Sequence, residues 1–206
     1  MKKIFALVVA FAIFLSGATS EAGEQLIEAS GEYVMDSRLD ETAASATARA
    51  REEAKRAAVE KAGVYLQSYS KMVGLILAED EVRTVTAQLL KIQDETSNVE
   101  VLEKNLLKFT VNIKALINEL DEKALKAIMN DRTAVEELTR KNKELQEKYD
   151  ALNRQMANYR KNFDSVGDAQ RVEIKKDVAR NSKNFTRSTN FLKATNFLFG
   201  KIFRGL

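Results

Sequence analysis

Apolar and polar residues alternate along two stretches of the chain, at 26–35 and at 107–114. Every second residue in each stretch is apolar or small, so one face of an extended segment can be buried while the other meets solvent. Val99 and Val101 mark a further strand shortly before the second stretch. These last two strands are expected to form a hairpin that turns near 103–105.

Between the first strand and this hairpin, the spacing of small and apolar residues becomes helical. A stripe of alanines predicts a helix over 40–62, and Gly63 is placed to end it in the left-handed conformation. Residues 64–69 are expected to form a second strand, and 79–90 a second helix. A strand–helix–strand unit implies a right-handed crossover and parallel pairing. Residues 24–117 are therefore predicted to fold as a small βαβαββ module of the α+β class, with a mixed sheet and helices on one face.

Residues of about 119–163 follow a heptad pattern. Apolar or aromatic residues recur there at alternating spacings of three and four, and Asn142 stands at a position where a buried amide often fixes a parallel two-stranded register. The pattern predicts a long coiled-coil helix and a homo-oligomer. Its interface would be formed by Val135, Leu138, Asn142, Leu145, Tyr149, Leu152, Met156, Tyr159 and Phe163. In the alternative arrangement, the helix packs on its own chain by folding back on a second helix after Gly167.

The last segment, 168–206, is basic and aromatic. Residues 171–206 hold nine Lys or Arg and two Asp or Glu, although the whole chain has a net charge of only +3. An amphipathic helix is predicted here, and it could contact an anionic membrane or an acidic partner, or cover an apolar patch of its own chain. The candidate contact residues are Phe191, Leu192, Lys193, Leu198, Phe199, Lys201, Ile202, Phe203 and Arg204.

The first twenty residues have the pattern of a cleavable secretory signal peptide. Two lysines precede a run of twelve apolar residues, 4–15, and small residues follow at 16–20. The apolar run is too short to span a bilayer as a helix, because twelve residues extend about 18 Å. The sequence around Ser16 resembles a lipoprotein box without its cysteine, so no lipid can be attached there. We expect an exported protein of the periplasm or cell envelope.

The amino-acid composition removes several classes of chemistry. The chain contains no His, Cys, Pro or Trp. It therefore has no disulfide, no thiolate metal site and no triad that uses histidine. Ser68 and Lys71 have the spacing of a Ser-Lys nucleophile pair, but the further boxes that such enzymes carry do not occur. The acidic triplet 79–81 suits a helix start. We expect no catalytic residue, cofactor or metal ion, and export argues against nucleic acid as a partner.

Several motifs of 26–117 together resemble a known envelope module. They are Ala29-Ser-Gly-Glu-Tyr33, the Ala-, Arg- and Glu-rich helix that ends in Glu60-Lys-Ala-Gly-Val-Tyr-Leu66, and the valine-rich hairpin. This segment is similar to the N-terminal domain of the flagellar T-ring/H-ring assembly protein and to a related family of surface lipoproteins. The resemblance implies a small α/β fold and carries no catalytic residues. It covers under half of the chain, and because the flagellar proteins carry further domains that this sequence does not show, it implies no flagellar role.

Together these patterns favour a non-enzymatic envelope protein. The module at 24–117 would recognise an envelope protein, the heptad helix would make homo-oligomers, and the basic tail would contact membrane or partner. A periplasmic holdase chaperone is the alternative, because the chain is exported, basic, helical and free of cysteine. An enzyme that uses carboxylates or a Ser-Lys pair is the third hypothesis.

Overall fold

The computed structural model describes residues 24–72, 74, 76–103, 105–118 and 132–202, and along 187–202 it describes only the helix backbone. These residues form a three-stranded antiparallel sheet and four α-helices, with a short 3-10 helix before α2 and another before α6. The elements in chain order are β1 (Glu24–Asp36), η2 (Ser37–Leu39), α2 (Ala43–Met72), α3 (Glu79–Leu89), β2 (Leu90–Glu103), β3 (Leu106–Asn118), α5 (Arg132–Asn162), η3 (Phe163–Ser165) and α6 (Asp168–Ile202).

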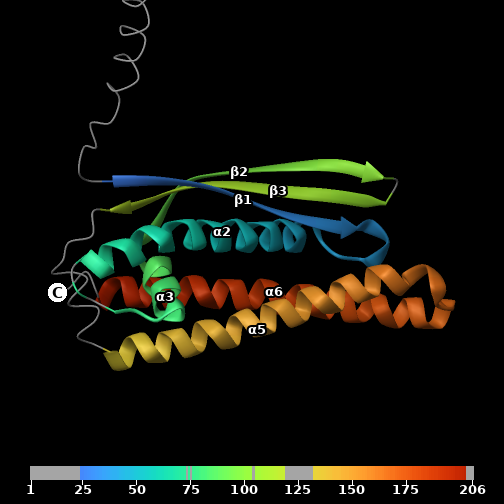
Figure 1. Cartoon of the computed structure of the whole chain (residues 1–206). Helices are drawn as coiled ribbons and strands as arrows, with labels where there is room; N and C mark the ends of the chain where they lie inside the picture. Colours follow the sequence, from blue (N-terminus) through green and yellow to red (C-terminus); the bar gives the residue numbers. More distant parts are fainter. Residues whose placement is uncertain (1–23, 73, 75, 104, 119–131, 203–206) are drawn as a thin grey trace, which may run out of the picture.

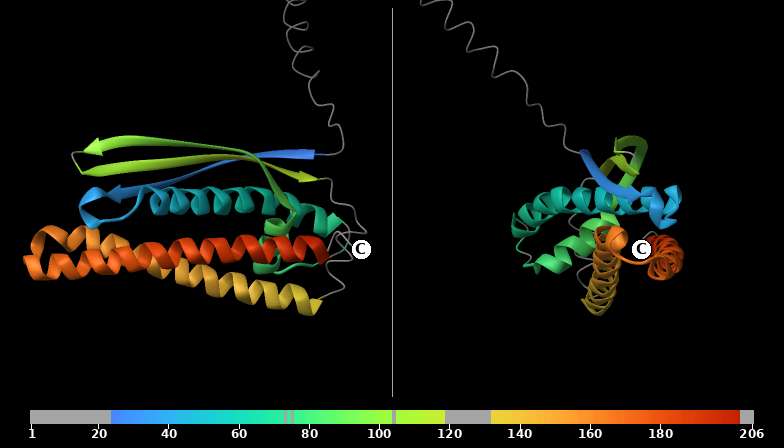
Figure 2. Two further views of the ribbon diagram at one scale, coloured as in Figure 1. Left: turned by 180° about the vertical axis from the view of Figure 1, so that it is seen from behind. Right: turned by 90° about the vertical axis from the view of Figure 1, so that its right-hand side faces the viewer.

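The elements are arranged in three layers (Figure 1). The sheet, in the order β1-β3-β2, forms the first layer, and α2 runs along one of its faces. The hairpin of α5 and α6 lies on the other side of α2, and the two further views in Figure 2 show the same separation of sheet and hairpin. The mixed α/β composition, the hairpin between β2 and β3 and the second helix, α3, are as predicted.

The predicted strand at 64–69 is wrong, because α2 continues through it to Met72. The buried stripe of α2 keeps a spacing of four residues beyond the alanines, through Ala62 to Leu66 and Ser70. Gly63 therefore lies inside the helix and does not end it; a Cβ there would stand 3.5 Å from Val82 of α3. With no strand at this position, the described sheet contains no parallel pair, and the module is βααββ instead of βαβαββ.

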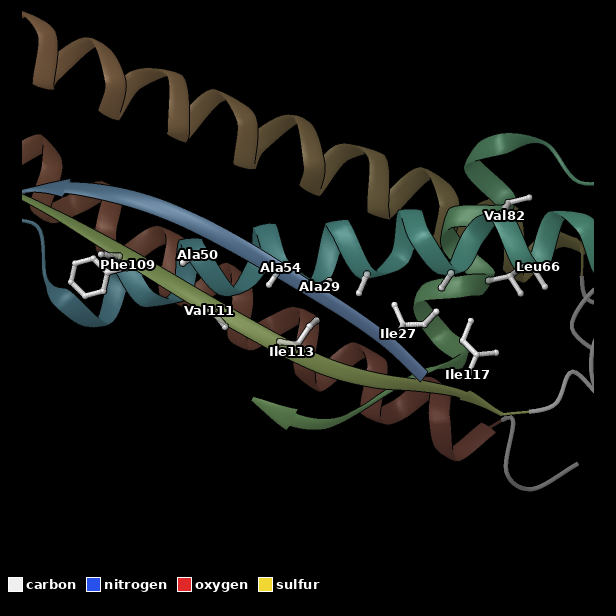
Figure 3. Close-up of a cluster of buried hydrophobic side chains, with 14 of the residues drawn as sticks. Ile27, Ala29, Ala50, Ala54, Leu66, Val82, Phe109, Val111, Ile113 and Ile117 are labelled. Carbon is white, nitrogen blue, oxygen red and sulfur yellow. The ribbon is translucent and has the colours of Figure 1, made fainter. Parts of the chain in front are cut away.

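A glycine in β1 lets α2 lie close to the sheet. A Cβ on Gly31 would stand 2.1 Å from the backbone nitrogen of Ala54 and 2.3 Å from the carbonyl oxygen of Ala50. The helix backbone thus rests against the strand at Gly31, and the alanine stripe of α2 fills the remaining space. Around this contact, apolar side chains of β1 and β3 form the main core (Figure 3): Ile27, Ala29, Phe109, Val111, Ile113 and Ile117.

The helical hairpin is joined to this module by buried side chains at both ends of α5. Val135 belongs to the main core. At the other end, Met156 and Phe163 pack with Val178 of α6 and with Leu39 of η2 in a second cluster. After Gly167 the chain folds back as α6, so α5 packs on its own chain. This is the alternative arrangement of the heptad segment.

Within the described residues, no helix is both long enough and apolar enough to span a bilayer. The predicted signal peptide at 1–20 lies outside these residues, as does most of the segment before α5, at 119–131.

Candidate functional site

A cleft of about 960 Å³ lies between α2, α3, α5 and the beginning of β2. The alanine stripe of α2 faces the sheet, so the neighbouring face of this helix forms one wall. The helix α3 lines another part, and α5 lies opposite. The lining includes Arg51, Lys55, Arg56 and Val59 of α2, Arg83 and Thr84 of α3, Ile92 and Glu95 of β2, and Asn142, Leu145, Tyr149 and Asp150 of α5.

The charged side chains of the cleft pair with one another across its walls. Arg51 Nε donates to Glu95 Oε1 at 2.7 Å, which ties α2 to β2. The hydrogen bonds that Arg51 donates to Glu95 raise the pKa of Arg51 above its usual value, against the effect of burial. Arg56 Nη2 lies 3.2 Å from Asp150 Oδ1 of α5. The cleft therefore offers a mixed polar and apolar surface without an excess of positive charge. Such a surface suits a polypeptide better than a compact anion.

Polar groups on α3 and α5 meet at another part of the cleft. The hydroxyl of Thr139 donates to Thr84 Oγ1 at 3.1 Å, and the amide of Asn142 lies 3.5 Å from the same oxygen. The predicted heptad residue Asn142 thus has a partner on its own chain. These contacts hold α3 against α5 at the edge of the cleft.

Beside the cleft, the side chain of Arg49 is completely buried where β1, α2, α5 and α6 meet. Its guanidinium donates to Glu41 at 3.1 Å, to Asn181 of α6 at 2.6 Å and to Asn153 of α5. It also stacks over the ring of Phe185, 4.3 Å from the centroid. This arginine network is satisfied from every side, so we assign it a structural role.

Two other groups of the arginine network have shifted pKa values. Burial raises the pKa of Tyr33 well above its usual value, and the neighbouring charge of Glu41 acts in the same direction. The Tyr33 hydroxyl therefore stays protonated and donates to Glu41 Oε2 at 3.0 Å. Burial also raises the pKa of Glu41, although Arg49 opposes the shift. Tyr33 is bonded to Glu41, and Glu41 is bonded to Arg49. Neither group is therefore free to act as an acid or a base.

The predicted heptad interface packs on the same chain. Val135, Leu138, Met156 and Phe163 are buried, and Leu145 and Leu152 are half-buried. The hydroxyl of Tyr149 lies 3.1 Å from the carbonyl oxygen of Arg49 and 3.0 Å from Glu53. The hydroxyl of Tyr159 donates to Asp177 of α6 at 3.0 Å. Self-association through these residues stays a prediction, and it would require them to leave α2, α3 and α6.

The predicted tail contacts fall at the end of α6 and beyond it. Residues 191–202 belong to the helix backbone, and residues 203 and 204 lie outside the described residues. Contact of this surface with membrane or partner stays a prediction. One face of the preceding part of α6 is packed inside the protein, because Val178, Asn181, Ser182 and Phe185 are all buried.

Sequence reasoning missed the exposure of β2. Every residue of this strand from Lys91 to Glu103 is exposed. The strand pairs with β3 along one edge, and no described element pairs with its other edge. The signal was present in the stretch 94–98, Asp-Glu-Thr-Ser-Asn, which has no apolar residue and so nothing to bury on either face.

The catalytic hypotheses gain no support from the positions of the residues on which they rested. Ser68 and Lys71 lie on α2 instead of on a strand, and the Ser68 hydroxyl donates to the Val64 carbonyl at 2.9 Å. Among the described residues, no group of three Asp or Glu side chains is placed to hold a metal ion.

Comparison of the chain with protein-family models, with curated proteins and with solved structures found no match. The similarity of 26–117 to the flagellar assembly domain and the surface lipoproteins therefore stays an expectation from its sequence motifs.

Proposed function

We propose that this protein is a non-enzymatic interaction module of the cell envelope, which binds a polypeptide partner along β2 and the cleft next to it. The observation that supports this proposal most is that β2 has an open edge and exposed faces. It is a 14-residue strand, bonded on one edge, exposed on both faces and continuous with the lining of the cleft.

An open edge of this length is unusual for a soluble fold. Unpaired backbone N–H and C=O groups form a template for another strand, and natural proteins usually shorten, twist or cover such edges. Here the edge also carries large apolar side chains, since Ile92, Val99 and Val101 are 41%, 50% and 69% exposed. An extended segment that pairs with β2 would satisfy the backbone groups and bury these side chains in one step.

The envelope location in this proposal rests on the signal-peptide pattern of 1–20. Homo-oligomerisation and contact of the basic tail with membrane or partner also remain part of it. The arginine network supports the proposal indirectly, because it fixes α5 against α2 and so fixes the opposite wall of the cleft.

The absence of cysteine allows a direct test of the binding surface. A single cysteine can be placed at Val101 on β2, or at Val172 on α6 as a matched control, because both are exposed valines, at 69% and 54%. Each variant would carry a thiol-linked photo-crosslinker and be mixed with envelope fractions of the cells that make it. We expect a discrete adduct from Val101→Cys and none from Val172→Cys. Equal adducts at both positions, or none at either, would contradict the proposal.

A holdase chaperone remains the second candidate, and the same exposed apolar residues of β2 favour it. The two functions differ in selectivity. A holdase should suppress the aggregation of an unfolded outer-membrane protein at a low molar ratio, as measured by light scattering. A dedicated interaction module should have no effect at that ratio.

A further inference from the structure

We propose that the segment bound by β2 is an extended basic strand, with lysines or arginines on one face and apolar residues on the other. This inference rests on the proposed function and specifies the chemistry of the partner. It follows from which side chains β2 presents on each of its two faces, and from the charge of both open edges of the sheet.

The pairing register assigns the faces of β2. Val99 is paired with Phe109 and Val101 with Leu107, and Phe109 is buried against α2. These valines therefore lie on the face that looks toward the helices, together with Ile92, the partner of Ala115. A strand added to β2 would find an exposed apolar surface on this face, formed by Ile92, Val99 and Val101.

The other face of β2 is acidic. Asp94 is paired with Lys114 and Glu100 with Lys108, on the face of the sheet that no described helix covers. Lys108 Nζ lies 3.1 Å from Glu100 Oε2, so β3 supplies some compensating charge. Glu95 lies on the helix-facing side, since it is paired with Ile113 and bonded to Arg51 of α2. The outer face of β2 nevertheless carries three carboxylates, of Asp94, Glu100 and Glu103, against a single lysine, Lys91. A basic residue on the outer face of an added strand would stand beside these carboxylates.

Charge also argues against a second copy of this chain as the added strand. The opposite edge of the sheet, β1, contains Glu24, Glu28, Glu32 and Asp36 and no lysine or arginine. Pairing β2 with the β2 or β1 of another copy would therefore place acidic strands side by side, and like charges on adjacent strands are destabilising. Such an arrangement disfavours edge-to-edge self-association while leaving the edge open to a basic partner.

Three fluorescent peptides test the chemistry by anisotropy with the purified chain. The first alternates valine and lysine over nine residues, the second replaces each lysine with glutamate, and the third is the basic peptide with alternate backbone nitrogens methylated. We expect saturable binding of the basic peptide, and binding at least about tenfold weaker for the acidic peptide, which brings like charges together. The methylated peptide should bind as weakly, because it cannot complete the backbone pairing. Equal binding of all three, or stronger binding of the acidic peptide, would overturn the inference.

A matched pair of variants tests the location. Asp94 on β2 and Glu28 on β1 are both paired with Lys114, so Asp94→Lys and Glu28→Lys add the same charge beside the same residue on opposite edges. We expect Asp94→Lys to weaken binding of the basic peptide about fivefold and Glu28→Lys less than twofold. Circular dichroism checks that both variants fold. Equal weakening by the two variants would overturn the placement on β2.

The outcome separates this inference from the proposed function. A specific cross-link at Val101 without binding of the basic peptide would leave the interaction surface in place and remove the basic strand. In the opposite case the cross-link at Val101 fails, but Asp94→Lys still weakens binding of the basic peptide. That result would support the inferred binding chemistry of β2 and contradict the proposal of a partner in the envelope.

Discussion

The guanidinium of Arg49 is a charged group that can be buried because hydrogen-bond partners surround it. Glu41, Asn153 and Asn181 accept its hydrogen bonds, and the ring of Phe185 covers its face. Burying an unpaired charge is strongly unfavourable, whereas a fully bonded charge can be accommodated. The residue therefore makes the docking of α5 and α6 dependent on one another.

We expect Arg49→Met to lower the free energy of unfolding by about 3 kcal/mol or more, because it leaves the Glu41 carboxylate buried without its cation. Arg51→Met is the matched control, since the Arg51–Glu95 pair is partly exposed, with side-chain exposures of 28% and 29%. Its loss should stay within about 1 kcal/mol. Urea unfolding followed by circular dichroism measures both, since the chain has no tryptophan. Equal losses would show that the arginine network is not the stronger contact.

Gly31 permits a second residue-scale test. A methyl group at Gly31 would overlap the α2 backbone, whereas one at Gly167 would meet no atom within 4 Å. We expect Gly31→Ala to destabilise the protein by about 3 kcal/mol, the upper end for an overpacked core, and Gly167→Ala to change stability by less than about 1 kcal/mol. Thermal unfolding of the two variants measures the difference. A tolerated Gly31→Ala would contradict the close approach of β1 and α2.

Asp36 gives the protein a predictable response to acid. Burial alone would raise its pKa, but the hydrogen bonds from Arg38 outweigh burial and hold the pKa below its usual value of 3.8. The Arg38 guanidinium also donates to Asp164 at 2.6 Å, so one arginine has a buried and an exposed partner. Since the folded-state pKa is lowered, the ionised Asp36 stabilises the fold above the unfolded value. That contribution is lost as pH falls through the folded-state pKa.

We expect the free energy of unfolding of the wild type to exceed that of Asp36→Asn by roughly 1 kcal/mol at pH 6. This difference should shrink as pH falls below about 4. Asp164→Asn should show almost no effect at any pH, because that carboxylate is 72% exposed. Urea unfolding at a series of pH values measures both margins. A margin for Asp36→Asn that stays constant down to pH 3 would contradict the assignment.

At the scale of elements, the sequence predicted those features that depend on local pattern. Alternation located β1 and β3, and valines located the end of β2. The boundary between helix and strand at Gly63 was wrong, because this glycine lies inside α2, where it packs next to Val82 of α3, instead of ending the helix. Local propensity cannot reveal a neighbour that lies nineteen positions later, at Val82.

The continuation of α2 makes a prediction about Val64, which is 67% exposed. In a helix, an exposed valine is less favourable than alanine, whereas in a strand it is more favourable. We expect Val64→Ala to stabilise the protein by about 0.5 kcal/mol, as measured by the shift of the thermal transition. A loss of stability would favour the strand that the sequence alone suggested.

At the scale of the whole molecule, the candidate site arises from segments that are distant in sequence. The cleft joins the middle of α2 to α5, and the Arg51–Glu95 contact links positions 44 apart. The heptad pattern predicted a helix in this segment, and α5 is a helix. It could not specify whether the apolar seam meets another copy or α2, α3 and α6, because both arrangements bury the same side chains. The exposure of β2 likewise depends on tertiary packing, because α2 packs on β1 and β3 and scarcely reaches β2.

The strand order has a consequence for how the chain folds as it is made. The strand β1 pairs along its whole length with β3, whose residues follow their partners by 70 to 94 positions, and Asn181 reaches Arg49 from 132 positions away. Because synthesis begins at the N-terminus, β1 has no strand partner to cover its apolar residues until more than half of the protein has been synthesised. Pairings of such long range are slow, because loop closure precedes the contacts that reward it. We expect folding to be late and nearly all-or-none, with the N-terminal part dependent on the last helix.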